Sequence, residues 1–178
     1  MLKDLLDQRK DLQKYLFIRG FMITNDKFTV SAQFPFYGNW KQQKYGNYTF
    51  CVHELQNYYF VERDGCTFFL IGHAYNPYSM DYEEDVILSK LADVYLTDKL
   101  ACCKIINQLT GLFILGYTKG DDIEFIVDAS GMQYACYGVF NRKIYIASHM
   151  QLLDDCLDLN EDKYIEKLIR YKWYKYVF

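Results

Sequence analysis

Thiols and imidazoles are the side chains of this sequence that could do chemistry. A cysteine beside a histidine could act as a thiolate nucleophile, and a group of three or four such side chains could hold a metal ion. The cysteines are Cys51, Cys66, Cys102, Cys103, Cys136 and Cys156, and the histidines are His53, His73 and His149. No two cysteines are separated by two residues, and the adjacent pair Cys102 and Cys103 is poor geometry for joint ligation or an ordinary disulfide. We therefore expect no metal site and no cofactor, while a Cys-His-Asp group assembled by the fold is left open because such groups are recognised by geometry.

The redox state of these thiols follows from where the protein is expected to reside. The N-terminus has no apolar segment followed by a small-residue cleavage site, so secretion is not indicated. We expect a cytoplasmic protein with reduced, mostly buried cysteines. No apolar run approaches the roughly 18 residues that a membrane-spanning helix needs, so no membrane association is expected.

Composition bounds the size and class of the protein. With 178 residues, 51% of them hydrophobic, the chain has the length for one domain with a sizeable core. An aromatic content of 19% and only two prolines favour an interior built from sheets. The net charge of -3 gives no basic field for phosphates, so nucleic acid is not an expected partner.

The first half of the chain is expected to begin with an amphipathic helix over residues 2–16, where leucines recur at helical intervals. The apolar run 17–24 and the extended run 28–34, separated by Asn25 and Asp26, predict a hairpin. Three further β-rich runs are expected to form consecutive antiparallel strands, with a tight turn at Asp64-Gly65 between the last two. They are residues 48–53, 58–63 and 67–72.

Two helices are expected next. Residues 83–95 have helical periodicity, and Thr97 is the expected cap of a second helix that ends at Ile106. Four more strands should follow, over residues 112–117, 124–128, 133–139 and 143–147. Helices that fall between two runs of antiparallel strands predict an α+β protein in which two sheets pack face to face and helices cover their outer faces.

Three sequence blocks near the end of this series carry a resemblance. Asn107-Gln108-Leu109-Thr110-Gly111-Leu112-Phe113 leads into a strand, Asp128-Ala129-Ser130-Gly131 ends the next, and Ile146-Ala147-Ser148 ends the last. The order of these blocks resembles the N-terminal glutaminase-type domain of asparagine synthetases, and the likeness covers roughly residues 67–150. The resemblance implies a four-layer αββα sandwich, with two mainly antiparallel sheets flanked by helices.

The catalytic group of that family is missing. Such glutaminases use a cysteine at the processed N-terminus, placed at the start of the first strand, whereas this chain has Leu2 in an expected helix and no cysteine before Cys51. The family's oxyanion and substrate loops align with a degenerate pocket, in which an aliphatic side chain replaces the donor asparagine and Glu83 stands in for an aspartate. Its residues are Ile71, Gly72, His73, Asn76 and Glu83.

The residues that keep the family's pattern have a structural interpretation. Gly111 is expected to permit close packing or an unusual dihedral angle, and Asp128 is expected to accept backbone hydrogen bonds at the turn that Gly131 completes. The structural motif comprises Leu109, Gly111, Phe113, Asp128 and Gly131. We expect no catalytic residues in this chain.

The organisation that follows from the resemblance is a degenerate glutaminase-like domain over residues 1–160, and a helix over residues 161–178 that leads into a downstream domain. Its function would be that of a non-catalytic scaffold and docking surface for an ATP-dependent amide-forming synthetase domain in the same polypeptide. A homodimer is a further partner to consider. The alternative is a binding module that acts alone and reuses the pocket between its sheets for a small ligand or peptide. Aromatic residues between Phe34 and Phe60 fit either a binding surface or cross-strand packing.

Overall fold

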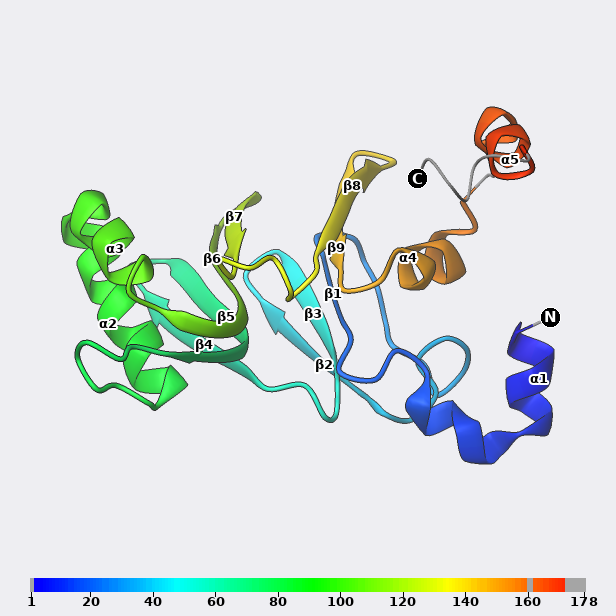
Figure 1. Ribbon diagram of the computed structural model, residues 1–178, viewed down its shortest axis with the longest axis horizontal. Helices are drawn as coiled ribbons and strands as arrows, with labels where there is room; N and C mark the ends of the chain where they lie inside the picture. Colours follow the sequence, from blue (N-terminus) through cyan, green and yellow to red (C-terminus); the bar gives the residue numbers. More distant parts are fainter. Residues whose placement is uncertain (1, 160–161, 172–178) are drawn as a thin grey trace.

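The protein is an α+β protein with two antiparallel sheets, described here from a computed structural model (Figure 1). The structure describes residues 2–159 and 162–171. The five-stranded sheet has the order β2-β3-β1-β9-β8, with β1 (Phe21–Thr24), β2 (Trp40–Tyr45), β3 (Tyr48–His53), β8 (Cys136–Phe140) and β9 (Lys143–Ala147). The four-stranded sheet has the order β4-β5-β6-β7, with β4 (Tyr58–Arg63), β5 (Cys66–Tyr75), β6 (Thr110–Lys119) and β7 (Asp122–Val127).

Six helices accompany the sheets in the described residues. They are α1 (Leu2–Gln8), the 3-10 helix η1 (Lys10–Tyr15), α2 (Glu84–Thr97), α3 (Lys99–Ile106), α4 (Met150–Leu157) and α5 (Lys163–Ile169). The expected helix over residues 2–16 is therefore divided at Arg9 into α1 and η1. None of these helices is both long and apolar enough to cross a membrane.

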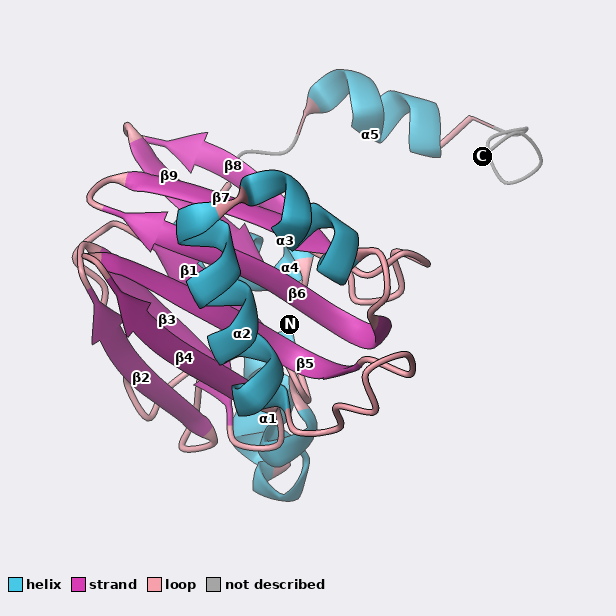
Figure 2. Cartoon of the chain, turned by 90° about the vertical axis from the view of Figure 1, so that its left-hand side faces the viewer, coloured by secondary structure: helices cyan, strands magenta, loops and turns pink. Residues whose placement is uncertain are grey.

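Three apolar clusters hold the elements together. Phe21 and Phe50 of the five-stranded sheet meet Phe69 of the other sheet in a buried cluster between the two sheets. Helices α2 and α3 pack on the outer face of the four-stranded sheet, as Figure 2 shows, and α4 packs on the outer face of the five-stranded sheet. The prediction of an α+β protein built on two antiparallel sheets is confirmed, and the central strands are apolar on both faces because each sheet is covered on both sides.

The hairpin expected from residues 17–24 and 28–34 is wrong. β1 begins only at Phe21 and pairs with β3 and β9, and residues 28–34 form no strand. The backbone of that segment bonds to a side chain instead: the Val30 N–H donates to Gln42 Oε1 at 2.7 Å, and Gln42 Nε2 donates to the Phe28 carbonyl at 2.9 Å. A single glutamine thus replaces the ladder that a partner strand would have supplied.

The expected series of three consecutive antiparallel strands is half correct. The Asp64-Gly65 turn joins β4 to β5 as predicted, but β3 and β4 lie in different sheets, and residues 54–57 carry the chain from one sheet to the other.

The edge strand β2 was not predicted, since most of its side chains are polar and exposed. Helix α4 was also not predicted, and α3 is capped by Asp98 rather than Thr97, with its carboxylate accepting from the Leu100 and Ala101 N–H groups.

The four strands expected after the helices are all present, as β6 to β9, although the last two belong to the five-stranded sheet. The helix expected over residues 161–178 is seen in its described part as α5, and Asp162 caps it by accepting from the Tyr164 and Ile165 N–H groups. The described helix ends at Ile169, and residues 172–178, including Trp173 and Tyr176, lie outside the described residues.

Candidate functional site

The start of β1 is closely packed and has no room for a nucleophilic side chain. A Cβ atom placed on Gly20, the residue before β1, would lie 2.7 Å from the Phe17 carbonyl oxygen and 3.1 Å from Ser148 Oγ. Leu2 lies in α1, at the far end of the N-terminal helical segment, as expected from the sequence. A residue at position 20 therefore cannot carry a reactive group of the cysteine or serine type without displacing backbone.

Ser148 and His149 form a hydroxyl–imidazole pair beside this strand. Ser148 Oγ lies 2.8 Å from His149 Nδ1, accepts from the Phe21 N–H at 2.9 Å and lies 3.3 Å from the Phe21 carbonyl oxygen. The serine is only 8% exposed, and burial lowers the pKa of His149. The Ser148 hydroxyl is buried and already bonded to the backbone of β1. It therefore links β1 to the start of α4, whereas a nucleophile would need an exposed hydroxyl.

His53, at the end of β3, is fully buried. Its Nδ1 accepts from the Leu55 N–H at 3.1 Å, and its ring makes an edge contact with Trp40 at a centroid distance of 5.8 Å. Burial lowers the pKa of this imidazole, so it is held in the neutral form. Among the described residues its Nε2 has no hydrogen-bond partner. His53 is therefore a core side chain that carries a proton on Nε2.

The five residues of the degenerate pocket are not brought into one cavity. Ile71 lies wholly in the core between the sheets, and Gly72 is buried beside it. His73 is exposed and bridges Asn57, whose Nδ2 lies 2.8 Å from His73 Nε2, and Glu84, whose Oε1 lies 2.8 Å from His73 Nδ1. These contacts tie the end of β5 to the first turn of α2.

The other two predicted pocket residues have turn and capping positions. Asn76 is buried, and its Oδ1 accepts from the Tyr78 and Ser79 N–H groups while its Nδ2 donates to Gln108 Oε1 at 3.2 Å. Glu83 is exposed at the N-cap of α2 and makes no side-chain cap bond. Asn76 lines a small cavity of about 160 Å³ near α2 and α3, whereas Ile71 faces the opposite side of the sheet.

Gly72 and Gly111 allow β5 and β6 to approach unusually closely. Gly72 has φ +110° and Gly111 has φ +133°, and the two flank the paired residues His73 and Leu112. A Cβ on Gly72 would lie 2.2 Å from the Leu112 carbonyl oxygen, and one on Gly111 would lie 2.1 Å from that of His73. The prediction of close packing or an unusual dihedral at Gly111 is confirmed, and both apply.

Asp128 organises the turn after β7, as predicted. Its Oδ1 accepts from the Ser130 N–H at 3.0 Å and from the Ser130 hydroxyl, and its Oδ2 accepts from the Gln133 N–H at 2.7 Å. Burial would raise the pKa of this carboxyl, but the hydrogen bonds outweigh burial and lower it. Gly131, with φ +63°, closes the turn by donating to the Asp128 carbonyl. Leu109 and Phe113, the remaining motif residues, are buried against α2 and α3.

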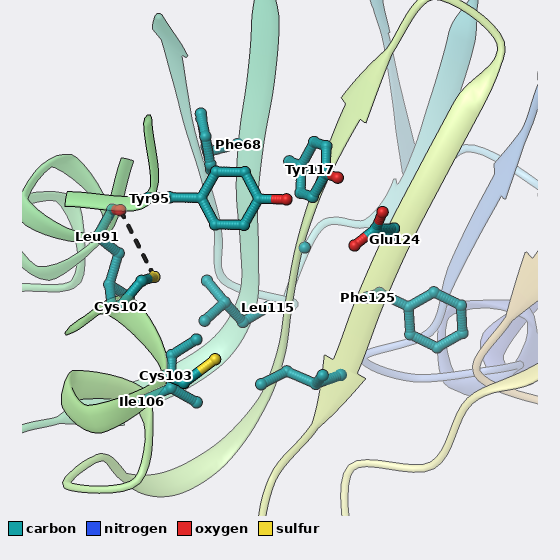
Figure 3. A pocket seen from close by; sticks show the side chains of 12 residues that line it. Phe68, Leu91, Tyr95, Cys102, Cys103, Ile106, Leu115, Tyr117, Glu124 and Phe125 are labelled. Atoms are coloured by element: carbon teal, nitrogen blue, oxygen red, sulfur yellow. Dashed lines mark hydrogen bonds between the residues drawn. The ribbon is translucent and has the colours of Figure 1, made fainter. Parts of the chain in front are cut away.

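A mainly apolar pocket lies elsewhere, between helices α2 and α3 and strands β6 and β7 (Figure 3). It has a volume of about 200 Å³. Its walls are mostly apolar, and the side chains that form them come from both helices, from both strands and from β5. They are Phe68, Leu91, Tyr95, Cys102, Cys103, Ile106, Leu115, Tyr117, Glu124, Phe125 and Ile126, with Gly116. A mainly apolar cavity with a few polar groups is the usual form of a small-molecule site.

The polar groups of this pocket converge at one end. The rings of Tyr95 and Tyr117 lie 4.8 Å apart, and Figure 3 shows the Tyr95 hydroxyl pointing toward Tyr117, with the Glu124 carboxylate on the next strand. Tyr95 Oη is buried and makes no close hydrogen bond among the described residues, although the Tyr117 hydroxyl and the Lys99 ammonium interact with it. Burial raises the pKa of Tyr117, and the neighbouring Tyr95 and Glu124 raise it further. Tyr117 therefore stays neutral and retains a proton to donate.

Two thiols line the opposite wall. Cys102 is buried and donates to the Leu91 carbonyl at 3.7 Å, whereas Cys103 is exposed and its sulfur points into the pocket in Figure 3. Burial raises the pKa of Cys102 and, to about 12, those of Cys51 and Cys156. The six cysteines thus differ greatly in accessibility.

We expect one thiol to react much faster than the other five in the folded protein. Cys103 is exposed, Cys156 is half-buried, and the remaining four cysteines are buried. With 5,5′-dithiobis-(2-nitrobenzoate) at neutral pH, the native protein should show a fast phase of one equivalent, and the other thiols should appear on denaturation. Cys103→Ser should remove the fast phase, while Cys156→Ser should leave it. A fast phase that survives Cys103→Ser would contradict the assignment.

Sequence reasoning did not find the Tyr95, Tyr117 and Glu124 group. Tyr95 follows Leu91 by four residues, so it lies on the same helix face as part of the core, and that spacing was the one available signal. The pairing of that face with β6 and β7 depends on the packing of α2 and α3 against the sheet. Among the described residues, no group of three or more His, Cys, Asp or Glu side chains is placed to hold a metal ion.

Comparison with models of known protein families and with curated proteins gives no match.

Proposed function

We propose that this chain is a non-catalytic, glutaminase-like domain that serves as scaffold and docking surface for an ATP-dependent amide-forming synthetase domain. The arrangement that supports this proposal is two antiparallel sheets packed face to face with helices on the outer faces, a layout that fits a four-layer αββα sandwich. The Asp128 to Gly131 turn and the close approach at Gly111 fit the blocks on which the resemblance rests.

The observation that carries the non-catalytic part is the packing before β1. In the family that the chain resembles, the nucleophile stands at the start of the first strand. Here that place holds Gly20, where a side chain has no room, and the neighbouring Ser148 hydroxyl is committed to the Phe21 backbone. Ile71, aligned with the family's oxyanion donor, is buried between the sheets and has no polar atom. Without a nucleophile and this donor, acyl transfer loses its two main sources of rate enhancement.

The catalytic test uses the purified chain and glutamine. We expect no release of glutamate above a blank without protein, under conditions in which an active glutaminase assayed beside it gives a clear rate. Each of the six cysteines should be replaced by alanine in turn if any rate is seen. A rate that disappears with one such replacement would overturn the proposal, because it would identify a working thiol nucleophile.

The scaffold test is the coding sequence beyond Phe178. A continuation with a phosphate-binding loop of the S-G-G-x-D-S type would support docking to a synthetase domain, and a stop at that codon would overturn that part of the proposal.

A stand-alone binding module is the second candidate. The observation that favours it is the pocket of Figure 3. Buried aromatic and aliphatic side chains fill the centre of the space between the sheets, and an open hollow lies at its edge between β7 and β8. The pocket of Figure 3, on the helix side of the four-stranded sheet, is a better binding cavity. A binding function would therefore use the outer face of that sheet.

A further inference from the structure

We propose that the pocket between α2, α3, β6 and β7 binds a small neutral aromatic molecule that carries one hydroxyl group, a phenol of the size of p-cresol. This inference is independent of the proposed scaffold function. It depends on the volume of the cavity, on the chemistry of its walls and on a buried hydroxyl at one end.

The volume limits the ligand to a single ring or a small fused ring. The pocket measures about 200 Å³, and an apolar cavity of about 150 Å³ is known to admit benzene in a protein core. Sites for larger, drug-sized ligands begin at about 300 Å³. One aromatic ring with a methyl and a hydroxyl substituent fills the space without requiring the helices to move.

The walls favour an aromatic ligand. Phe68, Tyr95 and Tyr117 form a triangle of rings, with centroid distances of 5.6 Å between Phe68 and Tyr95, 5.7 Å between Phe68 and Tyr117, and 4.8 Å between the two tyrosines. Leu91, Leu115 and Ile106 supply aliphatic contacts (Figure 3). Aromatic rings prefer edge and offset contacts of this kind, so a ligand ring can add to the cluster.

The buried Tyr95 hydroxyl determines the polar substituent. Tyr95 Oη is buried and makes no close hydrogen bond among the described residues, and a buried hydroxyl in this state gains from a well-placed acceptor. A ligand hydroxyl can accept the Tyr95 proton and donate its own toward Glu124. A charged ligand of either sign would lose hydration against apolar walls. The ligand is therefore neutral, with its hydroxyl at the tyrosine end.

The closest control ligand is toluene, which lacks only the hydroxyl of p-cresol. We expect p-cresol to bind at millimolar concentration or below, with shifts of the methyl resonances of Leu91, Ile106 and Leu115 in NMR titrations. Toluene should bind about tenfold more weakly, the effect of one hydrogen bond on a dissociation constant. p-Cresol should also slow the reaction of Cys103 with 5,5′-dithiobis-(2-nitrobenzoate), since that thiol lines the same wall.

The variant Tyr95→Phe tests the hydrogen bond. It removes only the hydroxyl and should weaken p-cresol about tenfold while leaving toluene unchanged, so that the two ligands bind alike. Tyr134→Phe, at an exposed position outside the pocket, should leave both affinities as they are in the wild type. Failure of p-cresol to shift the pocket methyls, or equal affinities of the two ligands for the wild-type protein, would overturn the proposal. The glutamine assay and the coding sequence beyond Phe178 do not bear on this result.

Discussion

Gly111→Ala is expected to abolish stable folding, or to lower the free energy of unfolding by at least about 3 kcal/mol. The added Cβ would lie 2.1 Å from the His73 carbonyl oxygen, which is backbone of the paired strand and cannot rotate away. The φ of +133° adds a further penalty, because side-chain-bearing residues rarely adopt it. Relief would require β5 and β6 to separate at the centre of the four-stranded sheet.

Gly72→Ala should behave in the same way, because its Cβ would lie 2.2 Å from the Leu112 carbonyl oxygen. The matched control is Gly138→Ala in β8, where no atom lies within 4 Å of the added Cβ and the backbone needs no positive φ. Urea unfolding followed by circular dichroism measures all three. A Gly111→Ala protein with the midpoint of Gly138→Ala would show that the strands do not approach as closely as described.

Asp128→Asn is expected to lower the free energy of unfolding at neutral pH by about 2 kcal/mol, the typical contribution of hydrogen bonds to a buried charged acceptor. The carboxylate accepts from three backbone N–H groups, those of Ser130, Met132 and Gln133. An asparagine can keep the bonds to one oxygen, but its amide nitrogen would then face an N–H donor. The turn would lose at least one bond and retain a buried group without a partner.

The pH dependence follows from the lowered pKa of Asp128. Because the folded-state pKa lies below the ordinary value of 3.8, the carboxylate stabilises the fold at pH values above that value. This stabilisation is lost as the pH falls through the folded-state pKa. The difference in unfolding free energy between wild type and Asp128→Asn should be full at pH 7 and should shrink below about pH 4.

The control for this prediction is Asp122→Asn, at an exposed position in β7, the strand that precedes the Asp128 turn. Its unfolding midpoint should equal that of the wild type at pH 7. Urea titrations at pH 7 and at pH 3 measure the two differences. A difference between wild type and Asp128→Asn that grows on acidification would contradict the assigned role of the carboxylate.

Local sequence signals predicted a turn or helix correctly where its formation depends on one short segment of the chain. The Asp64-Gly65 turn, the periodicity of residues 83–95 and the turn at Asp128 each depend on neighbouring residues, and each was predicted correctly. The division of the strands between two sheets could not be predicted in this way. β3 and β4 both contribute apolar side chains to the cluster between the sheets, so their patterns do not reveal that they lie on opposite sides of it.

The candidate site residues show the same contrast: roles set by the local chain were predicted, and those set by packing between elements were not. The role of Gly111 was predicted because a glycine inside a strand usually marks a bulge, a bend or the close approach of another backbone. The degenerate pocket was placed by alignment of side-chain types along one segment, and such an alignment does not show how deeply each position is buried. Ile71 and His73 are two residues apart, the spacing of one strand face, yet Ile71 is buried in the core and His73, nearer the end of β5, is exposed. The Tyr95 and Tyr117 pair was missed because the two residues come from different elements, and only the docking of α2 on the sheet brings them together.

The order of strands has a consequence for how the chain can fold. The four-stranded sheet uses only residues between Tyr58 and Val127, whereas β1, at the centre of the five-stranded sheet, pairs with β9 more than 120 residues later. Pairs that are far apart in sequence close larger loops and form more slowly. The four-stranded sheet with α2 and α3 can therefore assemble from a growing chain before β9 has been synthesised. Until then, β1 has β3 alone as a partner and presents its other backbone edge to solvent, and the five-stranded sheet closes last.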